Sequence, residues 1–120
     1  MTARRLKVGV VLPTYRRLAS PENIRRAATL SESLGFDSVW VTDHVVVPSA
    51  SVEAFGPTFY EGMAVMSYVS GITSRLPIRH ANLLVPYRQP PVPDEMLAPA
   101  HKLAGGRVTS GAALGRLPAV

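Results

Sequence analysis

The chain has 120 residues, of which 47% are hydrophobic and 18% are charged, a balance typical of one modest globular domain rather than a disordered segment. It contains no cysteine, which excludes disulfides, thiolate metal sites and cysteine nucleophiles within this sequence. The net charge of +5 comes from scattered arginine pairs without interleaved aromatic residues, and this pattern favours a solvated surface over nucleic-acid binding.

The apolar runs are short and interrupted by Gly or Pro, whereas a membrane span needs about 20 apolar residues. The N-terminal segment is basic but lacks the long apolar run and the small-residue cleavage site of a secretory signal. We therefore expect a cytoplasmic protein that has no membrane segment.

The first predicted strand covers residues 7–13, which are nearly all apolar with a β-branched bias typical of a strand buried on both faces of a parallel sheet. A helix is predicted next, with Ser20 as N-cap, Pro21 at the first position and Glu22 in the first turn. Gly35 suits its left-handed end. The expected buried face of this helix consists of Ile24, Ala27, Ala28 and Leu34.

Residues 38–42 form the second predicted strand, so a strand, a helix and a strand follow one another with short connections. This order predicts an α/β fold of parallel βαβ units with a right-handed crossover. Residues 45–60 are rich in Pro, Ser and Gly and are too long for a simple connector, which predicts a functional loop. A helix over residues 61–74 should then bury a wide apolar face formed by Met63, Ala64, Met66, Val69 and Ile72.

The remaining elements are a strand over residues 78–85, a proline-rich loop over residues 86–93 and a helix over residues 94–103. Proline in a helix interior costs about 3 kcal/mol, so Pro99 should kink or split this last helix. A fourth strand is expected over residues 107–110, and the residues after it carry no clear signal.

The best candidate for chemistry is the Asp43-His44 pair, which closes the second predicted strand. Histidine has an unperturbed pKa near neutrality and therefore suits proton transfer. The alternative is structural: Asp43 caps the following turn, and His44 is a partly buried histidine with one hydrogen bond. The histidines do not share the spacing of metal ligands, so no metal site is expected. Trp40 and Phe36 are expected in the core rather than stacked on a ligand.

Several segments together carry a family resemblance: LPTY at 12–15, ESLGFD at 32–37, SVWVTDH at 38–44, LVPYRQP at 84–90 and LAGGRV at 103–108. In this order they resemble the luciferase-like oxidoreductases, particularly the branch that uses the deazaflavin coenzyme F420. The resemblance implies a TIM (β/α)8 barrel, which needs about 250 residues. Residues 1–120 would then be a single truncated domain, the N-terminal half of such a barrel, whose part from residue 86 departs from the family pattern.

The resemblance also implies a reaction, namely hydride transfer between F420, or alternatively FMN, and a small organic substrate. By carry-over from the family, His44 would be the catalytic residue and Asp43 would help to bind the cofactor. Ala81-Asn82 matches the distorted peptide against which the cofactor ring rests. We expect self-association or pairing with a partner half-barrel, because a half-barrel leaves two sheet edges and an apolar face open. The alternative function is a non-catalytic remnant that acts at most as a binding module.

Overall fold

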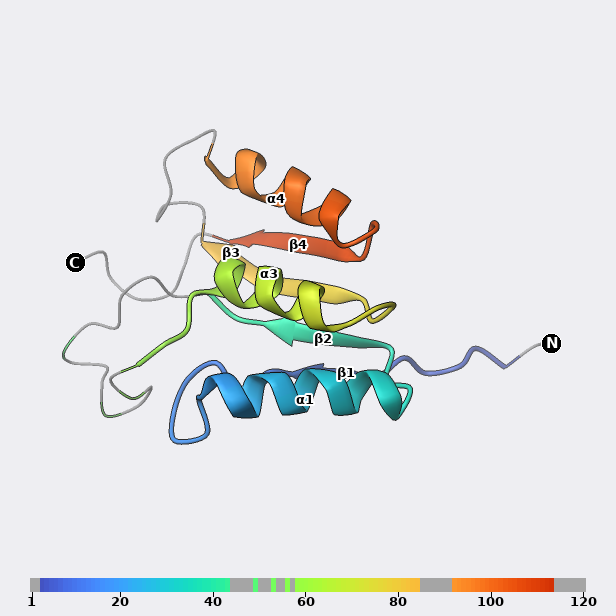
Figure 1. Ribbon diagram of the computed structural model, residues 1–120, viewed down its shortest axis with the longest axis horizontal. Coiled ribbons are helices and arrows are strands. Elements are labelled where there is room, and N and C mark those ends of the chain that lie inside the picture. Colours follow the sequence, from blue (N-terminus) through green and yellow to red (C-terminus); the bar gives the residue numbers. More distant parts are fainter. Residues whose placement is uncertain are drawn as a thin grey trace.

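A computed structural model describes residues 3–43, 49, 53, 56, 58–84 and 92–113, with the side chains of residues 82, 84, 92–94, 112 and 113 excepted. Its elements, in chain order, are β1 (Gly9–Val11), α1 (Pro21–Ser33), β2 (Ser38–Val41), α3 (Gly62–Ile72), β3 (Ile78–Leu84), α4 (Val92–Leu103) and β4 (Val108–Ala113). The strands form one parallel sheet in the order β1-β2-β3-β4. The three helices lie on one side of this sheet (Figure 1).

This arrangement confirms the predicted parallel βαβ units, and four consecutive parallel strands with helices on one side are the architecture of half a (β/α)8 barrel. Within the described part of the chain, no helix combines the length and the apolar character that a membrane span requires.

Helix α1 begins as its sequence predicts, because the side chain of Ser20 accepts a hydrogen bond from the amide of Asn23 and Pro21 occupies the first turn. Gly35 follows the helix with a φ of +80°, a conformation that glycine adopts without steric cost. The prediction of a buried Leu34 was wrong. Leu34 is the C-cap residue and is 71% exposed, whereas Ser31 completes the buried face beside Ile24.

The core lies between the sheet and the helices, and the alternation of strand side chains selects the residues that enter it. In the middle of the sheet, Val39 and Val41 of β2 and Ile78 of β3 are fully buried against the helix layer. The next residues along these strands, Trp40 and Arg79, therefore face the opposite side of the sheet, which we call the open face. No helix of the described residues covers this face.

The open face corrects two predictions. Strand β1 was expected to be buried on both sides, yet Val11 is 61% exposed because its side chain reaches the open face. Trp40 was expected in the core, yet it lies half-buried on the open face, above Gly9, with its indole nitrogen donating to the Ser38 hydroxyl at 2.9 Å. Phe36 is also outside the core, at 38% exposure, in the turn before β2.

Helix α4 is not split at Pro99, as one of the two predicted outcomes required, because it runs from Val92 to Leu103 with Pro99 inside it. The predicted kink stays a prediction. Two buried alanines, Ala100 and Ala104, hold its last turns against the sheet, so tertiary packing offsets the lost backbone hydrogen bond. Residues 92 and 93, predicted as loop, already belong to this helix, since its first turn tolerates a proline. Of the predicted loop over 86–93, residues 86–91 lie outside the described residues.

One boundary and one buried position also differ from the prediction. Strand β4 extends beyond the predicted residue 110 to Ala113, because β3 offers a partner along this length, with Leu84 opposite Ala113. In α3, Ala64 is exposed rather than buried, and Val65 takes its place in the core beside Met66.

Two long-range polar contacts hold the connection between α3 and β3. The carboxylate of Glu32 accepts hydrogen bonds from the backbone amides of Ser74, Arg75 and Leu76 at 2.9–3.1 Å. Partial burial of this carboxylate opposes its ionisation, but the three amides outweigh it and hold the pKa of Glu32 below its usual value. The guanidinium of Arg107 donates to the side-chain hydroxyl of Thr73. It also donates to four backbone carbonyl oxygens, those of Ser70, Thr73, Leu76 and Ala104.

Candidate functional site

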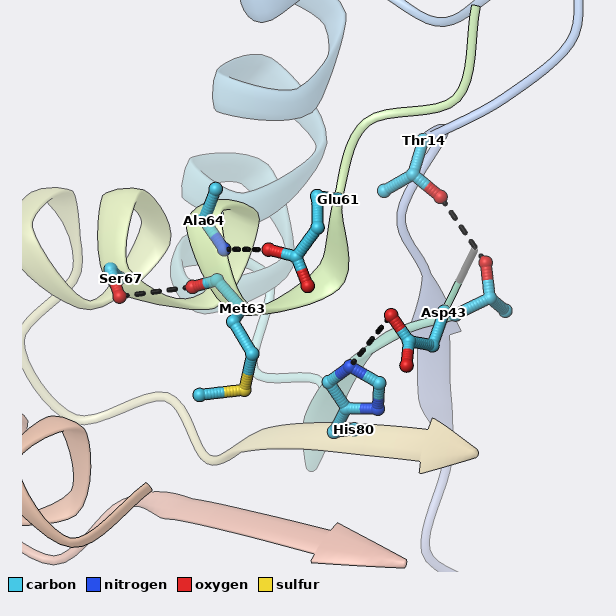
Figure 2. Close-up of polar contacts among 8 residues, drawn as sticks. Thr14, Asp43, Glu61, Met63, Ala64, Ser67 and His80 are labelled. Carbon is cyan, nitrogen blue, oxygen red and sulfur yellow. Dashed lines mark hydrogen bonds and ion pairs between the residues drawn. The ribbon is translucent and has the colours of Figure 1, made fainter. Parts of the chain in front are cut away.

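The carboxyl ends of β1 and β2 and the adjacent part of β3 bring four polar residues together. Thr14 follows β1, Thr42 and Asp43 follow β2, and His80 lies within β3. Three of them are almost completely buried, with exposures of 0% for Thr14, 4% for Asp43 and 1% for His80. The hydroxyls of Thr14 and Thr42 share a hydrogen bond of 3.3 Å. We call this group of four residues the strand-end cluster (Figure 2).

The register of the sheet explains why Asp43 meets His80. Val41 lies opposite His80 in the parallel pairing of β2 with β3, so both side chains face the helix layer. Asp43, two residues further, points to the same side by strand alternation. Its Oδ1 lies 3.9 Å from His80 Nε2, and both side chains are fully shielded from solvent. Figure 2 shows the two side chains facing each other beneath the start of α3.

Helix α3 begins directly against this pair, and a glycine makes that approach possible. A Cβ on Gly62 would lie 2.3 Å from His80 Nε2 and 2.9 Å from the carbonyl oxygen of Thr42, closer than atoms can pack. The helix is capped by Glu61, whose Oε2 accepts from the amide of Ala64 at 2.8 Å. The glycine at the first position of α3 thus allows the helix to pack directly against His80.

Phe59 and Tyr60, which precede α3, contact the residues that follow β1. The rings of Tyr15 and Phe59 stack with centroids 4.8 Å apart, and the two residues form an antiparallel bridge. The amide of Tyr60 donates to the carbonyl of Thr14 at 2.8 Å. Arg16 adopts a φ of +65°, unusual for a residue other than glycine, and its guanidinium lies 5.5 Å from the centre of the Tyr15 ring. These contacts close one side of the strand-end cluster.

The third strand is irregular beside the cluster. His80 lies opposite Ser110, whereas Leu83 lies opposite Ala112, so β3 contains one more residue than β4 over this stretch. Ala81 and Asn82 lie within this bulge. The family resemblance implies a distorted peptide at the same two residues, and their contact with a cofactor stays a prediction.

The carboxylate of Asp43 lies against His80, away from solvent. Its contact with a cofactor stays a prediction. His44 and most of the predicted loop over 45–60 lie outside the described residues. His80 was not predicted as a site residue, although its position two residues after Ile78, on the same strand face, indicates an interior place.

Two small residues lie close together next to the bulge. Ala81 follows His80 and therefore faces the open side, and Gly111 lies close by, since a Cβ built on it would be 3.2 Å from the carbonyl oxygen of Ala81. Ala81 and Gly111 thus lie side by side on β3 and β4, whereas Trp40 and Arg79 occupy the face nearer the amino ends. No group of three His, Asp or Glu residues suited to a metal occurs in the described part of the chain.

Comparisons with known proteins agree with this architecture. A sequence model described as luciferase-like monooxygenase matches residues 6–119, which is nearly the whole chain. No curated protein matches the sequence.

Solved structures resemble the fold at low sequence identity. The oxygenating constituent of 3,6-diketocamphane monooxygenase from Pseudomonas putida, solved in complex with FMN, has a TM-score of 0.75 at 18% identity, over 95% of this chain and 31% of that chain. EDTA monooxygenase from Chelativorans sp. BNC1 has a TM-score of 0.76 at 16% identity, over 98% and 31%. A monooxygenase from Streptomyces bottropensis has a TM-score of 0.71 at 20% identity, over 89% and 32%. The chain therefore spans about a third of the length of these proteins.

Proposed function

The chain belongs to the luciferase-like monooxygenase family, and from this membership we propose that it forms part of a flavin-type oxidoreductase acting on a small organic substrate. The cofactor would be a tricyclic ring system, either the deazaflavin F420 that the sequence resemblance favours or the FMN named for a solved relative. When bound, such a ring supplies the hydride chemistry. The observation that carries the proposal is the buried strand-end cluster at the carboxyl ends of the strands, where barrel enzymes place their sites.

The residues would have separate roles. Ala81, with Asn82 beside it in the bulge and Gly111 opposite, would leave space for the plane of the ring at the open face. His44 would hold or move a proton at an imidazole nitrogen, because its unperturbed pKa lies near neutrality. Asp43 precedes it directly, and the contact between Asp43 and His80 would fix the backbone from which His44 projects. In this arrangement Asp43 is a positioning residue for the cofactor pocket.

A titration tests the proposal. The purified chain is titrated with FMN and, separately, with F420, and cofactor fluorescence is followed at constant protein concentration. We expect saturable binding of one of the two, and the one that binds identifies the cofactor class. The absence of binding by both would contradict an oxidoreductase role for this chain.

Two pairs of variants test the assigned residues. Ala81→Leu fills the space at the open face and should weaken ring binding about tenfold or more, whereas Ala98→Leu, on the exposed side of α4, should not. Asp43→Asn should weaken binding, whereas Asp37→Asn, at the opposite end of β2, should leave it unchanged. Each variant is first shown by circular dichroism to be folded. Equal effects within either pair would refute the placement of the site.

A further inference from the structure

Asp43 and His80 are an ionisable pair enclosed between the sheet and α3. Both side chains are fully shielded from solvent, and Oδ1 of Asp43 lies 3.9 Å from Nε2 of His80 (Figure 2). This separation is within the range of an ion pair but is too long for a hydrogen bond. The attraction between the two groups therefore depends on charge, and an imidazole carries a charge only when it is protonated.

The start of α3 favours negative charge at this pair. A Cβ on Gly62 would lie 2.3 Å from Nε2 of His80, so the first turn of the helix packs directly on the ring. The amino end of a helix carries partial positive charge and stabilises an anion. Glu61, the N-cap residue, adds a second carboxylate at this helix start, and its Oε2 is bonded to an amide of the helix at 2.8 Å. The neighbouring strands contribute neutral groups, namely the Thr14 hydroxyl after β1 and Ser110, which lies opposite His80 on β4.

A carboxylate in such dry surroundings is costly unless positive charge compensates it. The amino end of a helix is equivalent to only about half an elementary charge. The imidazolium form of His80 supplies a full positive charge beside Asp43, and the low local dielectric strengthens their attraction. Protonation of His80 and the buried position of the Asp43 carboxylate therefore support each other.

We propose that protonation of His80 regulates the strand-end site. As an imidazolium, His80 holds Asp43 in its buried position and keeps the end of β2 against the start of α3. When the imidazole loses its proton, this attraction disappears and the end of β2 is released. For its consequence the proposal rests on the proposed function: the cofactor binds more weakly above the pH at which His80 titrates, because Asp43 and His44 lie just after β2.

NMR of the imidazole rings tests the charge of His80 without any cofactor. The chain has three histidines, so the ring signals of His80 can be assigned by elimination from His44→Gln and His101→Gln, and no variant at His80 needs to fold. The ring nitrogen shifts of His80 should be those of an imidazolium at about pH 6 and those of a neutral imidazole at about pH 9. A ring that stays neutral, or stays charged, over this whole range would overturn the proposal.

Urea unfolding separates the charge of His80 from its packing. Stability that comes from an imidazolium is present at low pH and is lost as the pH rises through its titration. The midpoint difference between wild type and His80→Gln should therefore be largest near pH 6 and should shrink toward about pH 9. Asp43→Asn should abolish this pH-dependent part of the His80→Gln effect, whereas His101→Gln, an exposed position on α4, should leave it intact. An unchanged pH-dependent effect in the Asp43→Asn background would contradict the coupling.

The consequence for the site is measured with FMN and with F420. Near pH 6 the Kd of the cofactor should be about tenfold higher for His80→Gln than for wild type, and the two proteins should bind equally near pH 9. Because both proteins are compared at each pH, titration of the cofactor itself cancels. A Kd ratio that is the same at both pH values would refute the regulation and leave the proposed function intact. Absence of binding by both cofactors would contradict the proposed function, and the ring signals and unfolding midpoints would still decide whether His80 is coupled to Asp43.

Discussion

The close approach of α3 to His80 predicts that the same substitution has opposite effects at two positions of one helix. Gly62 is the first residue of α3 and Gly71 the last but one, and replacing a helical glycine by alanine normally stabilises by up to about 1 kcal/mol. A Cβ on Gly71 would meet no atom within 4 Å, so Gly71→Ala should give about 0.5–1 kcal/mol of added stability.

At Gly62 the steric cost exceeds this gain. The new Cβ would lie 2.3 Å from the ring nitrogen of His80, and carbon contacts need about 3.5 Å, so the ring would have to move by about 1 Å. His80 is fully enclosed and the neighbouring Thr42 carbonyl belongs to the backbone, so neither group can yield freely. Overpacking of this kind costs about 1–3 kcal/mol, and Gly62→Ala should therefore destabilise the protein by about 1–2 kcal/mol after the helix propensity is subtracted.

Urea unfolding followed by far-UV circular dichroism measures both variants against the wild type. The protein concentration is held constant, because association would add to the apparent stability. With a slope of about 1–3 kcal/mol per molar urea, the midpoint of Gly62→Ala should fall by about 1 M and that of Gly71→Ala should rise slightly. A Gly62→Ala variant as stable as the wild type would refute the enclosed position of His80 at the helix start.

Two further predictions concern the polar contacts that hold the connection between α3 and β3. Glu32→Gln should destabilise by about 1–2 kcal/mol near pH 7 in urea unfolding, because the charged acceptor of three amides is lost. The folded-state pKa of Glu32 is lowered, so its contribution is present above the unfolded pKa and is lost as the pH falls through the folded value. The difference between Glu32→Gln and wild type should therefore vanish in acid, and a difference that does not depend on pH would contradict this account. Arg107→Lys should lower the thermal midpoint, with a cost of about 2–4 kcal/mol, because an ammonium group has three N–H donors and cannot reproduce the guanidinium contacts. Arg75→Lys, whose guanidinium makes none of these contacts, serves as the control.

The sequence by itself was sufficient for the order and type of the elements. The N-cap Ser20, Pro21 and the positive φ of Gly35 mark the ends of α1 through contacts between residues a few positions apart. Apolar runs separated by a capped helix were enough to predict parallel strands, because so short a connection leaves one crossover geometry. These signals depend on interactions between residues close together in the sequence.

Tertiary structure decided which face each residue occupies and which residues meet. Trp40 has the large apolar side chain typical of a core residue, but the register of β2 with β1 and β3 places it on the open face. Pro99 carries a strong local signal to break α4, but the burial of Ala100 against the sheet outweighs it. Whether the free energy gained by burial exceeds the local cost of the proline depends on contacts with residues that are distant in the sequence.

In the strand-end cluster, too, the sequence alone could not predict which side chains meet. Asp43 could be identified from its place at the end of a strand, but its partner His80 is far away in the chain and became a neighbour only through the pairing of Val41 with His80. Gly62 carries no signal of its own in the sequence, and its need to be glycine arises because α3 meets that pair. The sequence therefore predicted where a candidate site lies, and the sheet register determined which side chains meet there, because parallel pairing joins residues whose separation in the chain exceeds any local pattern.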